Sequence, residues 1–111
     1  MRCAVFLAAS LAAAVLVPGQ AAGYALLGSG DATCTAWTAA RHTPGGLDAA
    51  VQEQWVLGFL SGIGSMVLGE LDPLHGLKVD AVYDWLDGYC RNHPAATIEA
   101  AAGVFIQEHP R

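Results

Sequence analysis

The chain has 111 residues, 54% of them hydrophobic, and carries ten acidic side chains against five basic ones, for a formal net charge of −5. This length corresponds to one domain, and so few basic residues exclude the basic face that nucleic-acid binding requires. Much of the hydrophobic excess lies in the first 22 residues, so the remainder has the composition of a globular domain.

The first 21 residues have the pattern of a signal peptide. Arg2 gives the positive start, residues 3–17 are apolar apart from one serine, and residues 18–22 supply the break and small side chains that precede cleavage. The apolar run is shorter than the roughly 20 residues of a membrane-spanning helix. We therefore expect cleavage after Ala21 or Ala22, a periplasmic or secreted protein, and no membrane span after signal removal.

Loss of the leader removes Cys3 and leaves Cys34 and Cys90. An even pair of cysteines in an exported protein predicts a disulfide, with two free thiols as the alternative. Closing so long a loop stabilises a fold by about 4 kcal/mol through the entropy of the unfolded chain. That contribution is comparable to the whole net stability of many small domains.

The mature chain is expected to contain a flexible segment at residues 22–30 and one helical domain at residues 31–109. The first helix begins after an N-cap at Asp31 or Thr33, and residues 43–46 end it. It carries Cys34 and Trp37.

The longest predicted helix begins at Asp48 and ends near Leu68. Its large apolar side chains recur at spacings of three and four, at Val51, Trp55, Phe59, Ile63 and Met66. Gly58 and Gly62 lower helix propensity by about 1 kcal/mol each relative to alanine. Close packing in a groove, or a break in the helix, would explain them.

Residues 70–77 are predicted to form a turn-rich connection, because Pro73 discourages a helix. A third helix then follows, with Asp80 as its N-cap. Its core side is Val82, Tyr83, Leu86, Tyr89 and Cys90, and its outer side is Asp84, Asp87 and Arg91. Trp85 lies off the main stripe, so it either covers a second side of the core or makes a homodimer contact.

Residues 92–94 end the third helix, and Thr97 caps a last one. Its predicted inner face is Ile98, Ala101, Ala102, Phe105 and Ile106. No alternating run of β-branched residues predicts a strand. The expected fold class is all-α, a small single-domain bundle of about four helices with one disulfide.

Patterns typical of catalysis and metal binding are weak. Cys90 and His93 are three residues apart, but Pro94 makes that turn irregular and a disulfide would remove the nucleophilic thiol. The remaining histidines, His42, His75 and His109, stand alone rather than in a ligand-spaced pair. We therefore expect no enzyme activity, no metal and no cofactor.

Two short motifs carry a resemblance to known families. Residues 89–94, Tyr-Cys-Arg-Asn-His-Pro, followed by Thr-Ile-Glu-Ala-Ala at residues 97–101, resemble the HdeA family of periplasmic acid-stress chaperones. Residues 55–62, Trp-Val-Leu-Gly-Phe-Leu-Ser-Gly, are more weakly similar to the Tai-like immunity proteins, which block cell-wall amidases delivered by type VI secretion. Both resemblances imply an exported, non-enzymatic protein that binds other proteins.

The HdeA resemblance implies an acid-stress chaperone whose clients are unfolded proteins. The change of net charge in acid supports this prediction independently of the resemblance. Below about pH 3 the carboxylates are largely neutral. Four basic side chains, four histidines and the new amino terminus then take the mature chain from −6 to about +9. A loosened fold that the disulfide still tethers would expose Trp55, Phe59, Ile63 and Met66 as a client surface.

The immunity resemblance implies a specific protein partner, a cell-wall amidase. The candidate contact is the acidic connection that contains Glu70, Asp72 and His75. Its alternative interpretation is a solvated linker. An exported interaction domain for another protein partner, and a homodimer, stay open.

Overall fold

Four α-helices and one short 3₁₀ helix form the fold in this computed structural model, which describes residues 23–66 and 69–111. In chain order they are η1 (Gly28–Asp31), α1 (Cys34–Arg41), α2 (Leu47–Met66), α3 (Val79–Asn92) and α4 (Ile98–Glu108). Within these residues there is no strand, and the predicted all-α fold with one disulfide is confirmed. The predicted signal peptide, residues 1–21, lies outside the described residues.

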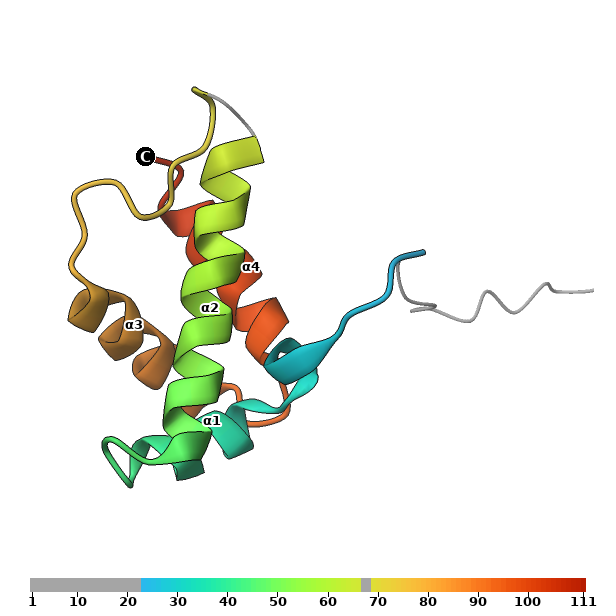
Figure 1. The fold of residues 1–111 in the computed structure, drawn as a ribbon, viewed down its shortest axis with the longest axis vertical. Coiled ribbons are helices and arrows are strands. Elements are labelled where there is room, and N and C mark those ends of the chain that lie inside the picture. Colours follow the sequence, from blue (N-terminus) through green and yellow to red (C-terminus); the bar gives the residue numbers. More distant parts are fainter. Residues whose placement is uncertain (1–22, 67–68) are drawn as a thin grey trace, which may run out of the picture.

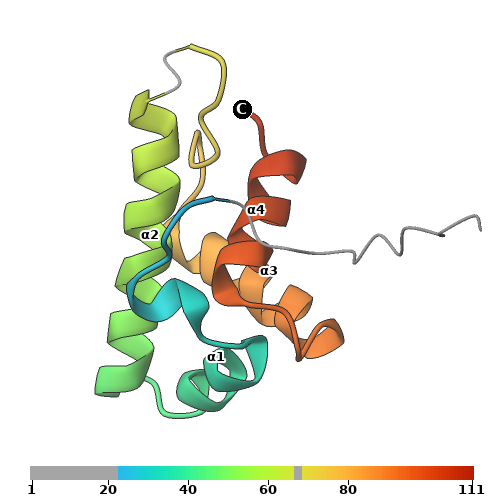
Figure 2. The same cartoon turned by 90° about the vertical axis from the view of Figure 1, so that its right-hand side faces the viewer.

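α2 packs across the other helices on one side of the molecule. In Figure 1 it stands in front of α1 and α4, with α3 to its left, and in Figure 2 it forms one edge of the bundle. Ala49, Val56 and Leu60 are its buried residues. The opposite side of α2 is uncovered, and Leu47 there is 78% exposed.

α2 buries a different side from the one that its large side chains predict. At the two ends of the predicted stripe, Val51 is 51% exposed and Met66 is 84% exposed. The helix is apolar on nearly every side, so the spacing of its residues does not single out one face. Packing against the other helices selects the line through Val56 and Leu60 instead.

The two glycines singled out in α2 are not in close contact with another described part of the chain. The helix continues through Gly58 and Gly62, and a Cβ atom at either position would have no neighbour within 4 Å. Neither a break in the helix nor close packing within the described chain therefore accounts for them.

Two threonines fix the starts of α1 and α4, as predicted. The hydroxyl of Thr33 accepts a hydrogen bond from the backbone N–H of Ala36, and that of Thr97 accepts one from Ala100. Thr33 and Thr97 also pair in an isolated antiparallel β-bridge. The segment that leads into α1 is therefore tied to the segment that leads into α4.

The core lies where α3 and α4 meet α1 and α2. α3 begins at Val79, with Lys78 as its N-cap, so Asp80 lies in the first turn rather than at the cap. The predicted inner faces of α3 and α4 are otherwise confirmed. The buried residues of this core are Cys34 and Trp37 from α1, Val56 and Leu60 from α2, Val82, Tyr83, Leu86 and Cys90 from α3, and Ile98, Ala101, Ala102 and Phe105 from α4.

The N-terminal segment that we expected to be flexible contacts α2 and α4. The indole N–H of Trp55 donates to the carbonyl of Leu27 at 3.1 Å. The hydroxyl of Tyr24 donates to the Glu99 carboxylate at 2.7 Å. The backbone of η1 runs so close to the indole that a Cβ atom at Gly30 would lie 2.2 Å from the Trp55 ring.

We predict that Gly30→Ala lowers the free energy of unfolding by about 1–3 kcal/mol, because the new methyl group forces the Trp55 ring out of its place. Thermal unfolding followed by tryptophan fluorescence measures the change. Gly58→Ala is the matched control, since its methyl group meets nothing and alanine favours a helix by up to about 1 kcal/mol. Equal destabilisation by both substitutions would contradict the packing of η1 on Trp55.

Candidate functional site

The Cys34–Cys90 disulfide joins the first turn of α1 to the end of α3, as predicted. Both cysteines are buried, and their Cα atoms lie 4.8 Å apart. The sulfur of Cys90 is thus not a free thiol beside His93. The imidazole of His93 instead stacks on Tyr89 at a ring distance of 4.1 Å.

The bridge aligns α1 and α3 in opposite directions. Trp37, three residues after Cys34, meets Asp87, three residues before Cys90, and the indole N–H donates to Asp87 Oδ1 at 2.7 Å. Arg41 and Tyr83 lie seven residues from the same cysteines, and the guanidinium carbon is 5.3 Å from the centre of the Tyr83 ring.

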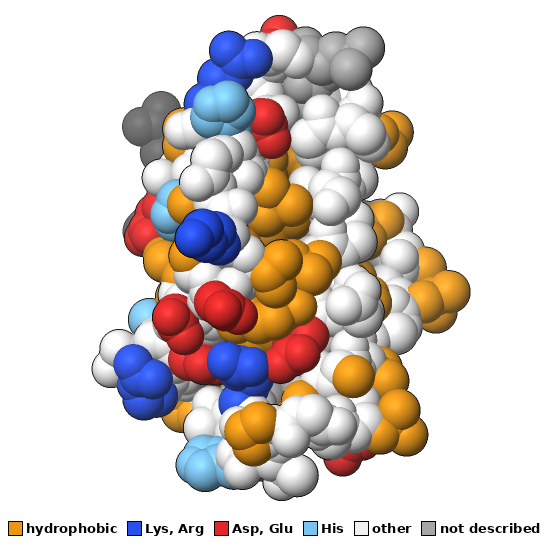
Figure 3. Space-filling model, turned by 60° about the vertical axis from the view of Figure 1, so that its left-hand side comes forward, with side chains coloured by type: hydrophobic (Ala, Val, Ile, Leu, Met, Phe, Trp, Pro, Cys, Tyr) orange, Lys and Arg blue, Asp and Glu red, His pale blue; other side chains and the backbone are white. Residues whose placement is uncertain are grey.

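Arg41 lies at the centre of an ionic network that joins three helices. From α1, its Nη1 donates to Glu53 Oε1 on α2 at 2.6 Å. Its Nε and Nη2 donate to the two oxygens of Asp87 on α3, each at 3.0 Å. We call Trp37, Arg41, Glu53, Tyr83 and Asp87 the Arg41 cluster. Figure 3 shows the molecule from the side on which α3 lies, and acidic and basic side chains gather in the lower half of this face.

Partial burial strengthens the attraction between these charged side chains. The side chains of Arg41 and Asp87 are only 26% and 24% exposed. The hydrogen bond to Asp87 raises the pKa of Arg41 above its ordinary value, and burial opposes this rise in part. The guanidinium therefore remains charged at every pH at which the fold exists. Burial, and then the negative charge of Glu53, raise the pKa of Tyr83.

Sequence reasoning missed this cluster. Asp87 was predicted on the outer side of its helix together with Asp84, but it is turned toward α1 and is half-buried. The signal was nevertheless present. Once Cys34 and Cys90 are paired and the two helices are taken as antiparallel, equal offsets along the chain place Trp37 opposite Asp87.

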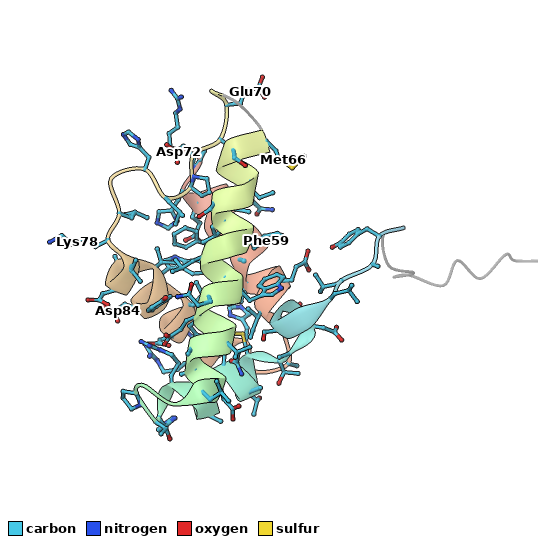
Figure 4. The ribbon with its side chains drawn as sticks, viewed as in Figure 1. Phe59, Met66, Glu70, Asp72, Lys78 and Asp84 are labelled. Carbon is cyan, nitrogen blue, oxygen red and sulfur yellow. A yellow bond between two sulfur atoms is a disulfide. The ribbon has the colours of Figure 1, made fainter. Side chains whose placement is uncertain are left out.

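The predicted client surface is partly covered in the intact fold. Trp55 and Phe59 are half-buried and stack on each other at 5.1 Å. Figure 4 places Phe59 midway along α2 and Met66 near its upper end. Ile63 is half-buried between them, and Met66 is exposed. Only part of this set is therefore accessible while the fold is intact.

The predicted partner loop starts above the upper end of α2 and runs back beside the last turns of this helix. Figure 4 shows Glu70 above the helix end and Asp72 lower down, where a Cβ atom at Gly64 would lie 3.7 Å from Asp72 Oδ1; Glu70 is exposed. His75 Nδ1 lies 3.4 Å from Asp72 Oδ2, and its side chain is 72% exposed. The structure thus brings Asp72 and His75 together.

Trp85 covers a second side of the core, one of the two roles expected for it. Its ring packs edge-on against Phe105 of α4 at 5.1 Å, and stacks on Tyr89 of its own helix at 5.4 Å. Its indole N–H donates to Glu108 Oε2 at 2.9 Å. α3 and α4 are therefore joined by aromatic contacts as well as by the buried core.

None of the helices in the described parts of the chain combines the length and the hydropathy that crossing a bilayer requires. In residues 23–66 and 69–111, no group of three or more His, Cys, Asp or Glu side chains is placed to hold a metal ion. No protein-family model, curated protein or solved structure matches the chain.

We predict that Asp87→Asn lowers the free energy of unfolding at pH 7 by about 2 kcal/mol, because it leaves a partly buried guanidinium without its main charged partner. Urea unfolding measures this value. The matched control, Asp84→Asn, removes the same charge from an exposed position of α3 and should change stability by less than about 0.5 kcal/mol. Equal effects would show that net charge, not the cluster, sets the stability.

The raised pKa of Tyr83 predicts a loss of stability in alkali. Above about pH 10 an unfolded tyrosine ionises while Tyr83 in the folded state keeps its proton. The unfolded state then binds fewer protons, so the free energy of unfolding falls as the pH rises. Urea unfolding between pH 8 and pH 11 should show this fall, with a shallower slope in Tyr83→Phe. An unchanged slope would contradict the burial of this hydroxyl.

Proposed function

We propose that this chain is an exported, non-enzymatic protein-binding domain that acts in the periplasm as an acid-stress chaperone of the HdeA-like kind. The Arg41 cluster carries the proposal, because the ion pairs that join α1 to α2 and to α3 depend on two carboxylates. The disulfide fits an oxidising compartment outside the cytoplasm.

Acid acts directly on these ion pairs. Protonation of Glu53 and Asp87 removes both negative partners and leaves a charged, partly buried guanidinium, which is strongly unfavourable. The mature chain meanwhile changes from a net charge of −6 to about +9, so its parts repel one another. α2 then keeps its apolar packing and the Trp55 contact to the N-terminal segment, but no ion pair to α1.

Histidines strengthen the other three helices under the same conditions. His42, His93 and His109 are the C-cap residues of α1, α3 and α4. In each, Nδ1 lies within 2.6–2.9 Å of the carbonyl oxygen four residues earlier. A protonated imidazole donates from Nδ1 and places a positive charge at the helix C-terminus, where the dipole favours it. The last turn of α2 has no basic residue.

The helix that acid releases is the one best suited to hold unfolded clients. From Gln54 to Gly69 the sequence contains no charged residue. Its buried side chains Val56 and Leu60 would join Trp55 and Phe59 on one accessible surface. The disulfide does not titrate, so α1 and α3 stay joined while α2 moves away.

We predict that the purified protein suppresses light scattering by an aggregating client at pH 2–3 and does not do so at pH 7. Asp87→Asn should raise the pH at which suppression begins, because one of the two carboxylates is already neutral. Asp84→Asn is the control of equal charge and should leave this pH unchanged. Absence of suppression in acid, with the protein in molar excess, would refute the chaperone function.

The loop after α2 supports a second candidate, an immunity-type inhibitor of a cell-wall amidase. Its backbone is fixed, since the N–H of Asp72 donates to the carbonyl of Pro110 at 2.8 Å and Pro73 is fully buried. Glu70 and His75 remain exposed on this fixed loop. An acidic loop of fixed shape is suited to enter an enzyme cleft.

Binding at pH 7 to a cell-wall amidase encoded beside this chain would support the inhibitor, and it should be lost in Glu70→Gln with Asp72→Asn. Retention of binding by that double variant would exclude the loop as the contact. Absence of binding by the unmodified protein would exclude the inhibitor itself.

A further inference from the structure

A groove between α3 and α4 lies apart from both surfaces considered above. It is a shallow, open groove of about 370 Å³, lined by Asp84, Trp85, Gly88, Tyr89, Asn92 and His93 of α3 and by Glu108 of α4. We call it the α3–α4 groove. None of its lining residues belongs to the Arg41 cluster or to the acidic loop.

One wall of the groove is a continuous aromatic stack. Trp85, Tyr89 and His93 follow one another at intervals of four residues, with nearly parallel rings at 5.4 Å and 4.1 Å. Edge-on packing on Phe105 holds the Trp85 ring, and the Nδ1 of His93 lies 2.9 Å from the carbonyl of Tyr89. The wall is therefore aromatic, and contacts within the chain hold its rings in place.

The rim of the groove carries hydrogen-bond acceptors from two helices. Glu108 receives the Trp85 indole N–H on Oε2, which leaves Oε1 free of that bond. Asn92 donates from Nδ2 to the carbonyl of Gly88, so its Oδ1 is turned to other donors. Asp84 is exposed and projects from the side of α3 that faces away from α2 (Figure 4). Among the described residues that line the groove there is no lysine or arginine, and the guanidinium of Arg91 lies 3.6 Å from where a Cβ atom of Gly88 would lie.

We propose that the α3–α4 groove binds an arginine or lysine side chain of a protein partner. Such a side chain has an apolar stem and a cationic head that bears several donors. The stem would pack along the stacked rings, and the head would meet the carboxylates of Asp84 and Glu108. The net charge of −6 on the mature chain attracts a basic partner over long range. The groove then provides the specific site at which one cationic side chain of that partner binds.

This site works under conditions opposite to those of the proposed chaperone activity. Its two carboxylates hold a cation only while they are charged, so binding belongs to neutral pH and to the intact fold. Binding of a cation in the groove is measured at pH 7, and suppression of client aggregation is measured at pH 2–3. A negative result in one experiment therefore does not decide the other.

The indole N–H of Trp85 provides a direct reporter, since it is bonded to Glu108 inside the groove. In a ¹H–¹⁵N spectrum at pH 7, titration with Nα-acetyl-arginine amide should move the Trp85 indole signal saturably. The indole signals of Trp37 and Trp55 should stay in place. Nα-acetyl-citrulline amide has the same shape without the charge and should move nothing. Equal shifts with both compounds would overturn the proposal.

Variants test whether the groove itself binds the cation. Asp84→Asn and Glu108→Gln should each weaken binding about fivefold, the upper range for an exposed ion pair. The control Asp80→Asn removes the same charge from the same helix, one turn away and outside the groove. If it weakens binding as much as Asp84→Asn, general attraction to an acidic protein is the cause and the site is refuted.

A steric block completes the test. A Cβ atom at Gly88 would meet only the Arg91 side chain, at 3.6 Å, so Gly88→Ala should preserve the fold. Gly88→Gln places a longer side chain in the groove and should abolish the saturable shift, with circular dichroism unchanged. Normal binding by a folded Gly88→Gln protein would overturn the proposal.

Discussion

The Cys34–Cys90 disulfide holds α1 and α3 side by side, and much of the remaining structure depends on the register that it sets. Because the two helices run in opposite directions from the bridge, Trp37 meets Asp87 and Arg41 meets Tyr83. In the same arrangement, Nη1 of the Arg41 guanidinium donates a hydrogen bond to Glu53 on α2. A covalent bond between two helices thereby positions the ionic contact to the third.

α2 is attached differently from its neighbours. α1 and α3 share the disulfide, and the segments before α1 and α4 share a backbone bridge at Thr33 and Thr97. α2 is held by apolar packing, by the Trp55 contact to the N-terminal segment and by its ion pair with Arg41. Of these attachments, only the ion pair is sensitive to acid. Protonation therefore removes the one ionic attachment of α2, whereas α1 and α3 lose the Arg41–Asp87 pair but keep the disulfide, and the histidine caps favour α1, α3 and α4.

Much of the fold could be predicted from the sequence. Thr33 and Thr97 are strong N-caps, and the inner faces of α3 and α4 have a clear apolar side and a clear polar side. α2 could not be oriented in this way, because apolar residues surround it and only contacts distant in the sequence choose Val56 and Leu60 for the core.

The Arg41 cluster and the α3–α4 groove were harder to predict for a related reason. Asp87 looks like any other acidic residue on a solvated helix until the disulfide fixes what lies opposite it. Trp85 could be recognised as unusual from its position, but Glu108 comes from another helix. A site formed by two helices depends on the packing angle between them, and the spacing of residues within each helix does not determine that angle.

Amide hydrogen exchange at pH 7 and pH 3, resolved along the chain, tests most directly whether acid releases α2 from a disulfide-tethered remainder. We predict that at pH 3, after correction for the intrinsic exchange rate, the amides of α2 around Val56 and Leu60 lose protection. Those of α1 and α3 near Cys34 and Cys90 should keep theirs. Loss of protection in all four helices together, or full protection of α2 at pH 3, would contradict it.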